Sequence, residues 1–189
     1  MQEIGDNLGR LDQALFEGLT GRDASGFLLT GPRDEAETRT HFTEPMFREL
    51  ASFLVEKYEN VVIDGGRWLS DDLVAAALQS STAVFLVLTQ EFAAIRNAQR
   101  YVAGLMRIGF TQDQVKIVVN RVRKQPDPNI ATIEQIKSTL NMPILASIPS
   151  SSVAPAAINK GRPFAGDKSD LDKSFRSFVD KAKIGRAHV

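Results

Sequence analysis

The chain has 189 residues, of which 43% are hydrophobic and 24% are charged. This balance is typical of a folded globular protein and excludes a disordered chain. The formal net charge is zero and cysteine is absent, so the sequence gives no support for electrostatic binding to nucleic acid and excludes disulfides and thiolate metal sites.

The first forty residues are predicted to hold a helix, a strand and a loop. Leucines at helical spacing indicate a helix over residues 8–19, with Gly21 as its stop. Residues 26–30 read as a strand that ends at Gly31-Pro32. The polar stretch 33–41 has no hydrophobic period and is predicted as a loop.

A helix over residues 43–58 and a strand over residues 60–66 are expected next. Thr43 can cap the helix, and Pro45 suits its first turn. Three consecutive β-branched residues in 60–66 predict a strand buried on both faces of a parallel sheet. Asp64 and two glycines end this strand, where a carboxylate can hold Mg²⁺ directly or through water. The same Asp-Gly-Gly residues are also common turn formers.

The rest of the chain alternates strands and helices. Apolar runs predict buried strands over residues 82–88, 115–120 and 144–148. Helical spacing predicts helices over residues 73–78, 91–108, 132–140 and 171–182. This alternation indicates an α/β fold of three layers, with a mostly parallel sheet, helices on both faces and right-handed crossovers.

Polar residues follow each predicted strand of this sheet and would converge on one edge. They are Asp64, residues 89–91, Asn120-Arg121 and residues 147–150. The Asn120 amide offers a donor and acceptors, as the reading of a purine edge requires, and the Arg121 guanidinium could stack on a base. The alternatives are an Asn that caps its own loop and an Arg in solvent.

Taken together, these segments resemble the MinD/ParA family of deviant-Walker ATPases. The matching segments are residues 61–64, 88–91, 96–100, 118–121 and 148–149, followed by Val153, Ala157, Asn159, Gly161 and Pro163. Residues 10–32 are similar to the CpaE/TadZ-like pilus-assembly branch of that family. The resemblance covers nearly all of residues 8–182 and implies a P-loop-NTPase-like fold.

The resemblance also implies a site for ATP and Mg²⁺. In the family, the position of Asp64 lies near Mg²⁺ and the γ-phosphate in the switch region, and the position of Asn120 recognises adenine. Pro149 and Ser150, with Arg121, would line the base pocket. Family members commonly form ATP-sandwiched homodimers in the cytoplasm, at the inner membrane or at the cell pole. They position a pilus or secretion assembly, a septum or a DNA segment.

The sequence departs from the family at the phosphate loop. No Gly-x-x-x-x-Gly-Lys-Ser/Thr motif occurs in the 189 residues. The acidic residue that follows the family's second strand is absent as well. Without the loop's N–H groups and lysine, we expect this chain to bind ATP weakly and to be inactive alone. The fold would then be truncated at its N-terminus, with the missing loop upstream of residue 1.

Two other interpretations stay open. The chain could be a non-hydrolysing scaffold of the same fold that acts through dimerisation. It could instead be a receiver-like phosphoacceptor domain in which Asp64 is phosphorylated, Asp34 and Glu35 hold the metal, and Thr89 ends the next strand.

Two features near the C-terminus complete the expectations. Residues 1–183 would form the partial ATPase domain, whereas residues 184–189 match a translated sequencing adapter and are expected to be non-native. The helix over 171–182 has an apolar face between lysines, which favours packing on the sheet, and membrane-surface binding is the alternative.

Overall fold

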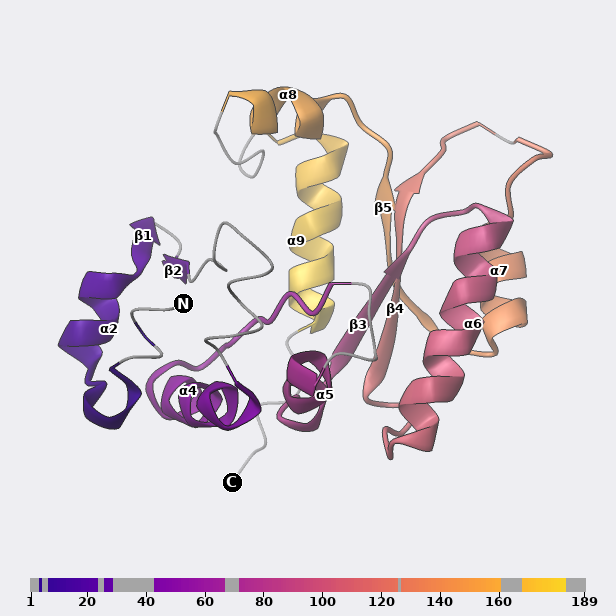
Figure 1. Cartoon of the computed structure of the whole chain (residues 1–189). Coiled ribbons are helices and arrows are strands. Elements are labelled where there is room, and N and C mark those ends of the chain that lie inside the picture. Colours follow the sequence, from indigo (N-terminus) through magenta and orange to yellow (C-terminus); the bar gives the residue numbers. More distant parts are fainter. Residues whose placement is uncertain are drawn as a thin grey trace. The chain divides into compact units, whose positions relative to one another are not determined.

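The computed structural model describes residues 4, 7–23, 26–28, 43–66, 72–125, 127–160 and 168–182. The chain divides into two compact units, Met1–Ser81 and Thr82–Val189, and each is described by itself (Figure 1). The predictions for the loop at 33–41 with Asp34 and Glu35, for Gly161 and Pro163, and for the tail at 184–189 fall outside the described residues.

The second unit is built on a parallel sheet of three strands. These are β3 (Val84–Leu88), β4 (Val115–Val122) and β5 (Ile144–Pro149), in the order β3-β4-β5. Each strand runs parallel to its neighbour, which requires a crossover between successive strands. The three strands predicted for this half of the chain are confirmed.

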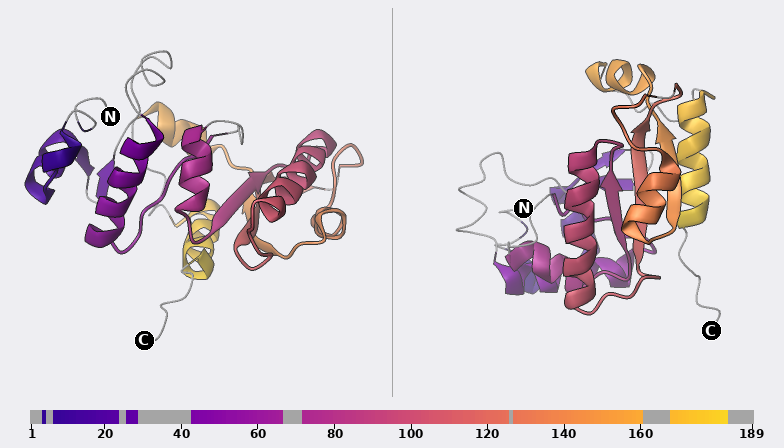
Figure 2. Two further views of the ribbon diagram at one scale, coloured as in Figure 1. Left: turned by 60° about the horizontal axis from the view of Figure 1, so that its bottom comes forward. Right: turned by 90° about the vertical axis from the view of Figure 1, so that its right-hand side faces the viewer.

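Helices cover both faces of this sheet. α6 (Phe92–Arg107) connects β3 to β4, and α7 (Ile133–Leu140) connects β4 to β5. Figure 2 shows α6 and α7 on one side of the strands and α9 (Asp170–Ala182) on the other. The predicted fold class, a three-layer α/β arrangement with a parallel sheet, is therefore confirmed.

The last helix, α9, packs on the sheet through its apolar face, as the sequence predicted. Leu171 is buried with three residues of β4 and β5, namely Val118, Ala146 and Ile148. Phe178 contacts Phe85 of β3 edge to face, with ring centroids 5.5 Å apart. Each fully buried side chain of this kind contributes about 1.5–3 kcal/mol. The opposite face of the helix is exposed, and Val179 beside the packed face is 50% accessible.

A side-chain cap begins α7, and a left-handed residue ends it. The Thr132 hydroxyl accepts a hydrogen bond from the Gln135 N–H at 3.2 Å, and Gln135 Oε1 accepts from the Thr132 N–H at 2.8 Å. This reciprocal capping box satisfies two amide groups that the first turn leaves without partners. Asn141 ends the helix in the left-handed conformation, with φ of 50°.

The prediction that residues 82–88 are buried on both faces is wrong. Burial alternates along β3, and the Phe85 and Val87 side chains are 38% and 57% exposed. In β4, by contrast, Val115, Ile117 and Val119 are all inaccessible to solvent. The difference follows from position, because β4 lies between two strands and β3 has one neighbour among the described residues.

The first unit packs helices around an aromatic core. The predicted helix over residues 8–19 is two elements, the 3₁₀ helix η1 (Leu8–Arg10) and α2 (Gln13–Leu19). They are separate because the Asp12 carboxylate accepts from the Leu15 N–H at 2.8 Å and starts a new helix. Phe16 is 2% exposed and contacts Phe53 and Tyr58 at centroid distances of 5.7 and 5.9 Å.

The helix predicted over residues 43–58 is confirmed as α4 (Glu44–Lys57). Thr43 precedes it at the capping position, although its side chain makes no capping hydrogen bond, and Pro45 lies in the first turn. The helix predicted over 73–78 is α5 (Asp72–Gln79). Leu50 of α4 is buried together with Ile4, Leu8 and Phe16.

The strand predicted over residues 26–30 belongs to a separate antiparallel pair. β2 (Gly26–Leu28) pairs with β1 (Gly21–Asp23), and the register joins Gly21 to Leu28. Gly21 therefore begins a short strand instead of only ending a helix. Neither strand is part of the three-stranded parallel sheet.

The buried strand predicted over residues 60–66 is not formed. Residues 60–65 pair with no strand, and the Val62 and Ile63 side chains are 93% and 39% exposed. The β-branched residues favour an extended backbone, but a ladder needs a partner strand, and no described residue supplies one here.

One further helix, α8 (Val153–Asn159), was not predicted. Within the described part of the chain, no helix combines the length and the apolar character that crossing a bilayer requires.

Candidate functional site

The candidate site is the edge of the second unit at which its parallel strands end. β3, β4 and β5 end at Leu88, Val122 and Pro149. The last two residues are partners in the ladder, and the Ser150 N–H donates to the Val122 carbonyl at 2.9 Å. The structure thus brings residues 89–91, 120–121 and 149–150 to one edge, as the sequence predicted.

Asn120 lies in a bend near the end of β4. Its side-chain Oδ1 accepts the Arg121 N–H at 2.8 Å, and no described residue accepts from its amide NH₂ group. Arg121 has φ of 56°, in the left-handed region that costs most non-glycine residues free energy. The β4–β5 register shifts between Val119 and Val122. The bend therefore leaves the donor half of the Asn120 amide available at the edge.

The Gln90 side chain connects the loops of this edge through hydrogen bonds. Its side chain is one of two polar or charged ones that are buried among the described residues, and it is 8% exposed. Oε1 accepts from the Arg123 N–H at 2.8 Å, and Nε2 donates to the Ala131 carbonyl at 2.8 Å. The Ala131 N–H in turn donates to the Gln90 carbonyl at 3.0 Å. One amide thus connects the loop after β3 with the loop after β4 and with Ala131, the residue before the α7 cap.

Two carboxylates beside the edge are stabilised in the ionised form. A hydrogen bond from the Thr89 side chain, then one from the backbone N–H of Glu91, and then the charges of Arg123 and Arg121 lower the pKa of Glu91. Donation by the Asn129 N–H, followed by the nearby Arg123, lowers the pKa of Asp127. At neutral pH the edge therefore carries guanidinium and carboxylate groups side by side.

Pro149 and Ser150 form the β5 side of the edge. Pro149 is half-buried at the last position of β5, and Ser150 is exposed after it. The Ser151 hydroxyl accepts from the Val153 N–H at 3.1 Å, where α8 begins. Their placement suits contact with a flat ligand next to Asn120, and their part in binding one stays a prediction.

Asp64 lies in the first unit and is exposed in a turn. Its Oδ1 accepts the Gly66 N–H at 3.1 Å, and Gly66 has φ of 64°. This is the turn chemistry that was the alternative reading of Asp-Gly-Gly. Among the described residues no group of three or more His, Asp or Glu side chains is placed to hold a metal ion. A metal role for Asp64 stays a prediction.

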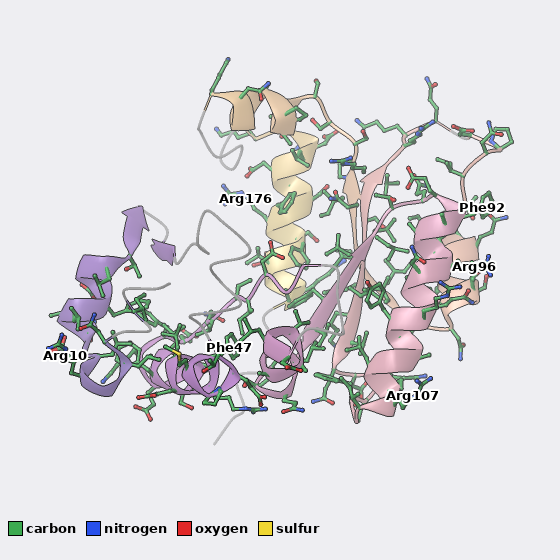
Figure 3. All side chains as sticks on the ribbon, in the orientation of Figure 1. Arg10, Phe47, Phe92, Arg96, Arg107 and Arg176 are labelled. Atoms are coloured by element: carbon green, nitrogen blue, oxygen red, sulfur yellow. The ribbon has the colours of Figure 1, made fainter. Side chains whose placement is uncertain are left out.

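Two shallow cavities border α6, with volumes of about 390 and 430 Å³. Both are lined by Phe92 and Arg96, which project from α6 in Figure 3. Neither cavity includes Asn120, Arg121 or Pro149. The candidate site is therefore the strand-end edge and not one of these cavities.

Curated relatives of the chain are septum site-determining proteins. It is 30% identical over 183 residues to the putative MinD of Mesostigma viride, covering 93% of this chain and 60% of that protein. It is 23% identical over 155 residues to MinD of Thermotoga maritima, covering 80% of this chain and 57% of that protein. No protein-family model matches the chain.

Solved structures agree on the fold. The ParA family ATPase of Chlorobium tepidum gives a TM-score of 0.83 at 20% identity, over 95% of this chain and 73% of that one. MinD of Pyrococcus horikoshii, solved with Mg-ADP, gives a TM-score of 0.77 at 17% identity, over 97% of this chain and 74% of that one. The chain is related to the MinD/ParA ATPases.

This MinD/ParA relationship sets the fold as P-loop-NTPase-like. The chain spans about three fifths of the length of the curated MinD proteins that it matches. The relationship does not separate a CpaE/TadZ branch from MinD or ParA, so that branch stays a prediction.

Sequence reasoning placed Gln90 at the edge of this candidate site but gave it no role. A glutamine directly after an apolar strand looks like any polar loop residue, since its partners lie 33 and 41 residues away. One signal was present in the sequence: Gln90 stands between a strand predicted to be buried and a long predicted helix, and a buried amide there needs hydrogen-bond partners.

Proposed function

We propose that this chain supplies the adenine-binding part of an ATP site in a MinD/ParA-like ATPase. The observation that carries the proposal is the Asn120 amide, half-buried at the strand-end edge with its NH₂ group available. Oδ1 has a second lone pair, so it can accept from the adenine N6 amino group while Nδ2 donates to a ring nitrogen. Guanine has a carbonyl in place of that amino group, and its oxygen would face Oδ1.

Asp64 would act near the phosphates and Mg²⁺ in this proposal. Oδ1 is engaged in the turn, which leaves the second carboxylate oxygen to hold a Mg²⁺-bound water. Mg²⁺ usually keeps several waters and takes one or two carboxylates, so a single Asp fits such outer-sphere contact. MinD of Pyrococcus horikoshii, solved with Mg-ADP, supports nucleotide and Mg²⁺ as ligands.

The assembly role follows from the family resemblance of the sequence. We place the protein in a pilus or secretion assembly of the CpaE/TadZ type, acting as an ATP-dependent homodimer in the cytoplasm or at the inner membrane. The MinC:MinD complex of Aquifex aeolicus, matched with a TM-score of 0.65, supports a protein partner. Since the Gly-x-x-x-x-Gly-Lys-Ser/Thr motif does not occur in these 189 residues, the chain alone would bind ATP weakly.

The adenine proposal is tested by titrating the ¹⁵N-labelled chain with AMP and with GMP at millimolar concentrations. We expect AMP to shift the amide signals of Asn120 and Arg121 and GMP to shift them less. Asn120→Ala should reduce AMP affinity about tenfold, since a hydrogen-bonded contact of this kind contributes about 1–3 kcal/mol. Asn97→Ala is the matched control, because Asn97 is exposed on α6. Equal shifts by both nucleotides, or an unchanged response in Asn120→Ala, would contradict the proposal.

A second candidate is a non-hydrolysing scaffold of the same fold that dimerises without ATP. Sedimentation of a version extended upstream to include a phosphate loop separates the two, because an ATPase would dimerise only with ATP and a scaffold without it. The receiver-like reading is not favoured, since the relatives and solved structures that the chain matches are MinD and ParA proteins.

A further inference from the structure

The buried side chain of Gln90 makes hydrogen bonds to two loops, which packing alone does not require. Burying an amide without partners is costly, and this amide uses its Oε1 and its Nε2 on backbone groups of two different loops. One of those groups is the Arg123 N–H, the first backbone donor after β4 ends at Val122.

The Arg123 N–H lies three residues beyond Asn120, across the left-handed Arg121. A left-handed non-glycine residue persists where its surroundings hold it on both sides. Before Arg121, the Asn120 Oδ1 accepts the Arg121 N–H. After it, Val122 is joined to β5 through Ser150, and the hydrogen bond to Gln90 fixes the chain at Arg123.

We propose that Gln90 is a positioning residue for base recognition. By holding the Arg123 N–H, it keeps Arg121 left-handed and so orients the Asn120 amide toward the edge. Gln90 does not touch the base and acts only through the backbone of 121–123. This inference rests on the proposed function, because it assigns Gln90 to the same adenine site.

Two variants separate positioning from simple stabilisation. Gln90→Met keeps the length of the side chain but loses the acceptor for Arg123 and the donor for Ala131. Gln90→Glu keeps the acceptor for Arg123 and loses only the donor for Ala131. Both variants should be less stable than the parent chain, since each leaves the buried Ala131 carbonyl with one hydrogen bond fewer. Gln90→His, with a ring nitrogen that can accept, replaces Gln90→Glu if that chain does not fold.

The measured quantity is the preference for AMP over GMP in the ¹⁵N titration. We expect Gln90→Met to lower this preference about tenfold and Gln90→Glu to retain most of it, because one well-oriented hydrogen bond accounts for about a tenfold change. In the free chain, the HN–Hα coupling of Arg121 should change in Gln90→Met and not in Gln90→Glu, since it reports φ. A purely structural glutamine would lower stability in both variants and leave preference and coupling unchanged.

The outcomes distinguish this inference from the proposed function. If Asn120→Ala loses the preference for AMP and Gln90→Met keeps it, the positioning role is overturned and the adenine site stands. If the parent chain shows no preference, or Asn120→Ala keeps it, the proposed function fails and the inference fails with it. If Gln90→Met loses the preference while Gln90→Glu keeps it, the positioning role is supported.

Discussion

β4 in the second unit and residues 60–65 in the first unit both contain runs of β-branched residues, yet only β4 forms a ladder. Val115, Ile117 and Val119 of β4 are inaccessible to solvent between two neighbouring strands. Val62 is 93% exposed. Composition favours an extended backbone in both segments, and a neighbouring strand decides which of them becomes part of a sheet.

The two units also have separate cores. The first packs Phe16 with aliphatic residues of its helices, whereas the second packs aliphatic and aromatic residues between its parallel sheet and helix α9. Substitutions in each unit therefore test whether the cores are independent, since separate cores open separately in hydrogen exchange.

The largest effect is expected for Phe16→Ala. Phe16 is 2% exposed and contacts two aromatic rings, so its removal leaves a cavity and should cost about 3–5 kcal/mol. Hydrogen exchange followed by mass spectrometry should show faster exchange in α2 and α4 and unchanged exchange in β4. Equal acceleration in both units would show that they unfold together and would remove the contrast between them.

Ile136→Ala should give the reciprocal result. Ile136 is fully buried on α7, and its truncation should cost about 2–5 kcal/mol. Exchange should accelerate in α7 and β5 and stay unchanged in α2. Lys137→Ala, at the next and exposed position, is the control and should change stability by less than about 0.5 kcal/mol. If Ile136→Ala changed neither stability nor hydrogen exchange, Ile136 would not be part of the core in solution.

A smaller effect is expected for Thr132→Ala. The substitution removes the hydroxyl that accepts the Gln135 N–H, and loss of such a cap costs about 1 kcal/mol. Exchange should accelerate in the first turn of α7. Thr139→Ala, an exposed position of the same helix, should show no loss. Similar behaviour of the two variants would mean that the cap does not hold α7 in solution.

The smallest effect is expected for Val62→Thr. An exposed side chain outside any ladder should change stability by less than about 0.5 kcal/mol. Thermal unfolding of this variant and of Val119→Thr, a buried position in β4, compares the stability lost at an exposed and at a buried position. A large loss in Val62→Thr would show that residues 60–65 are buried or paired in solution.

Sequence reasoning succeeded where the structure depends on local patterns. The strands at 82–88, 115–120 and 144–148 are read from apolar runs, and the helix α7 is read from helical spacing. The break at Asp12 was missed because the leucine period continues through it while the carboxylate starts a new helix. Whether residues 60–65 form a ladder depends on a partner strand far away in sequence, and so do the hydrogen bonds of Gln90. The hydrophobic period of a segment does not report such distant partners.

The left-handed backbone at Arg121 also limits how this position can vary among homologues. Glycine, asparagine or aspartate would adopt φ near 56° at low cost, whereas valine or isoleucine would be strained there. Chains that keep the bend are expected to draw residue 121 from arginine and these three, and a β-branched residue would mark a relative in which β4 runs straight and the neighbouring asparagine is directed elsewhere.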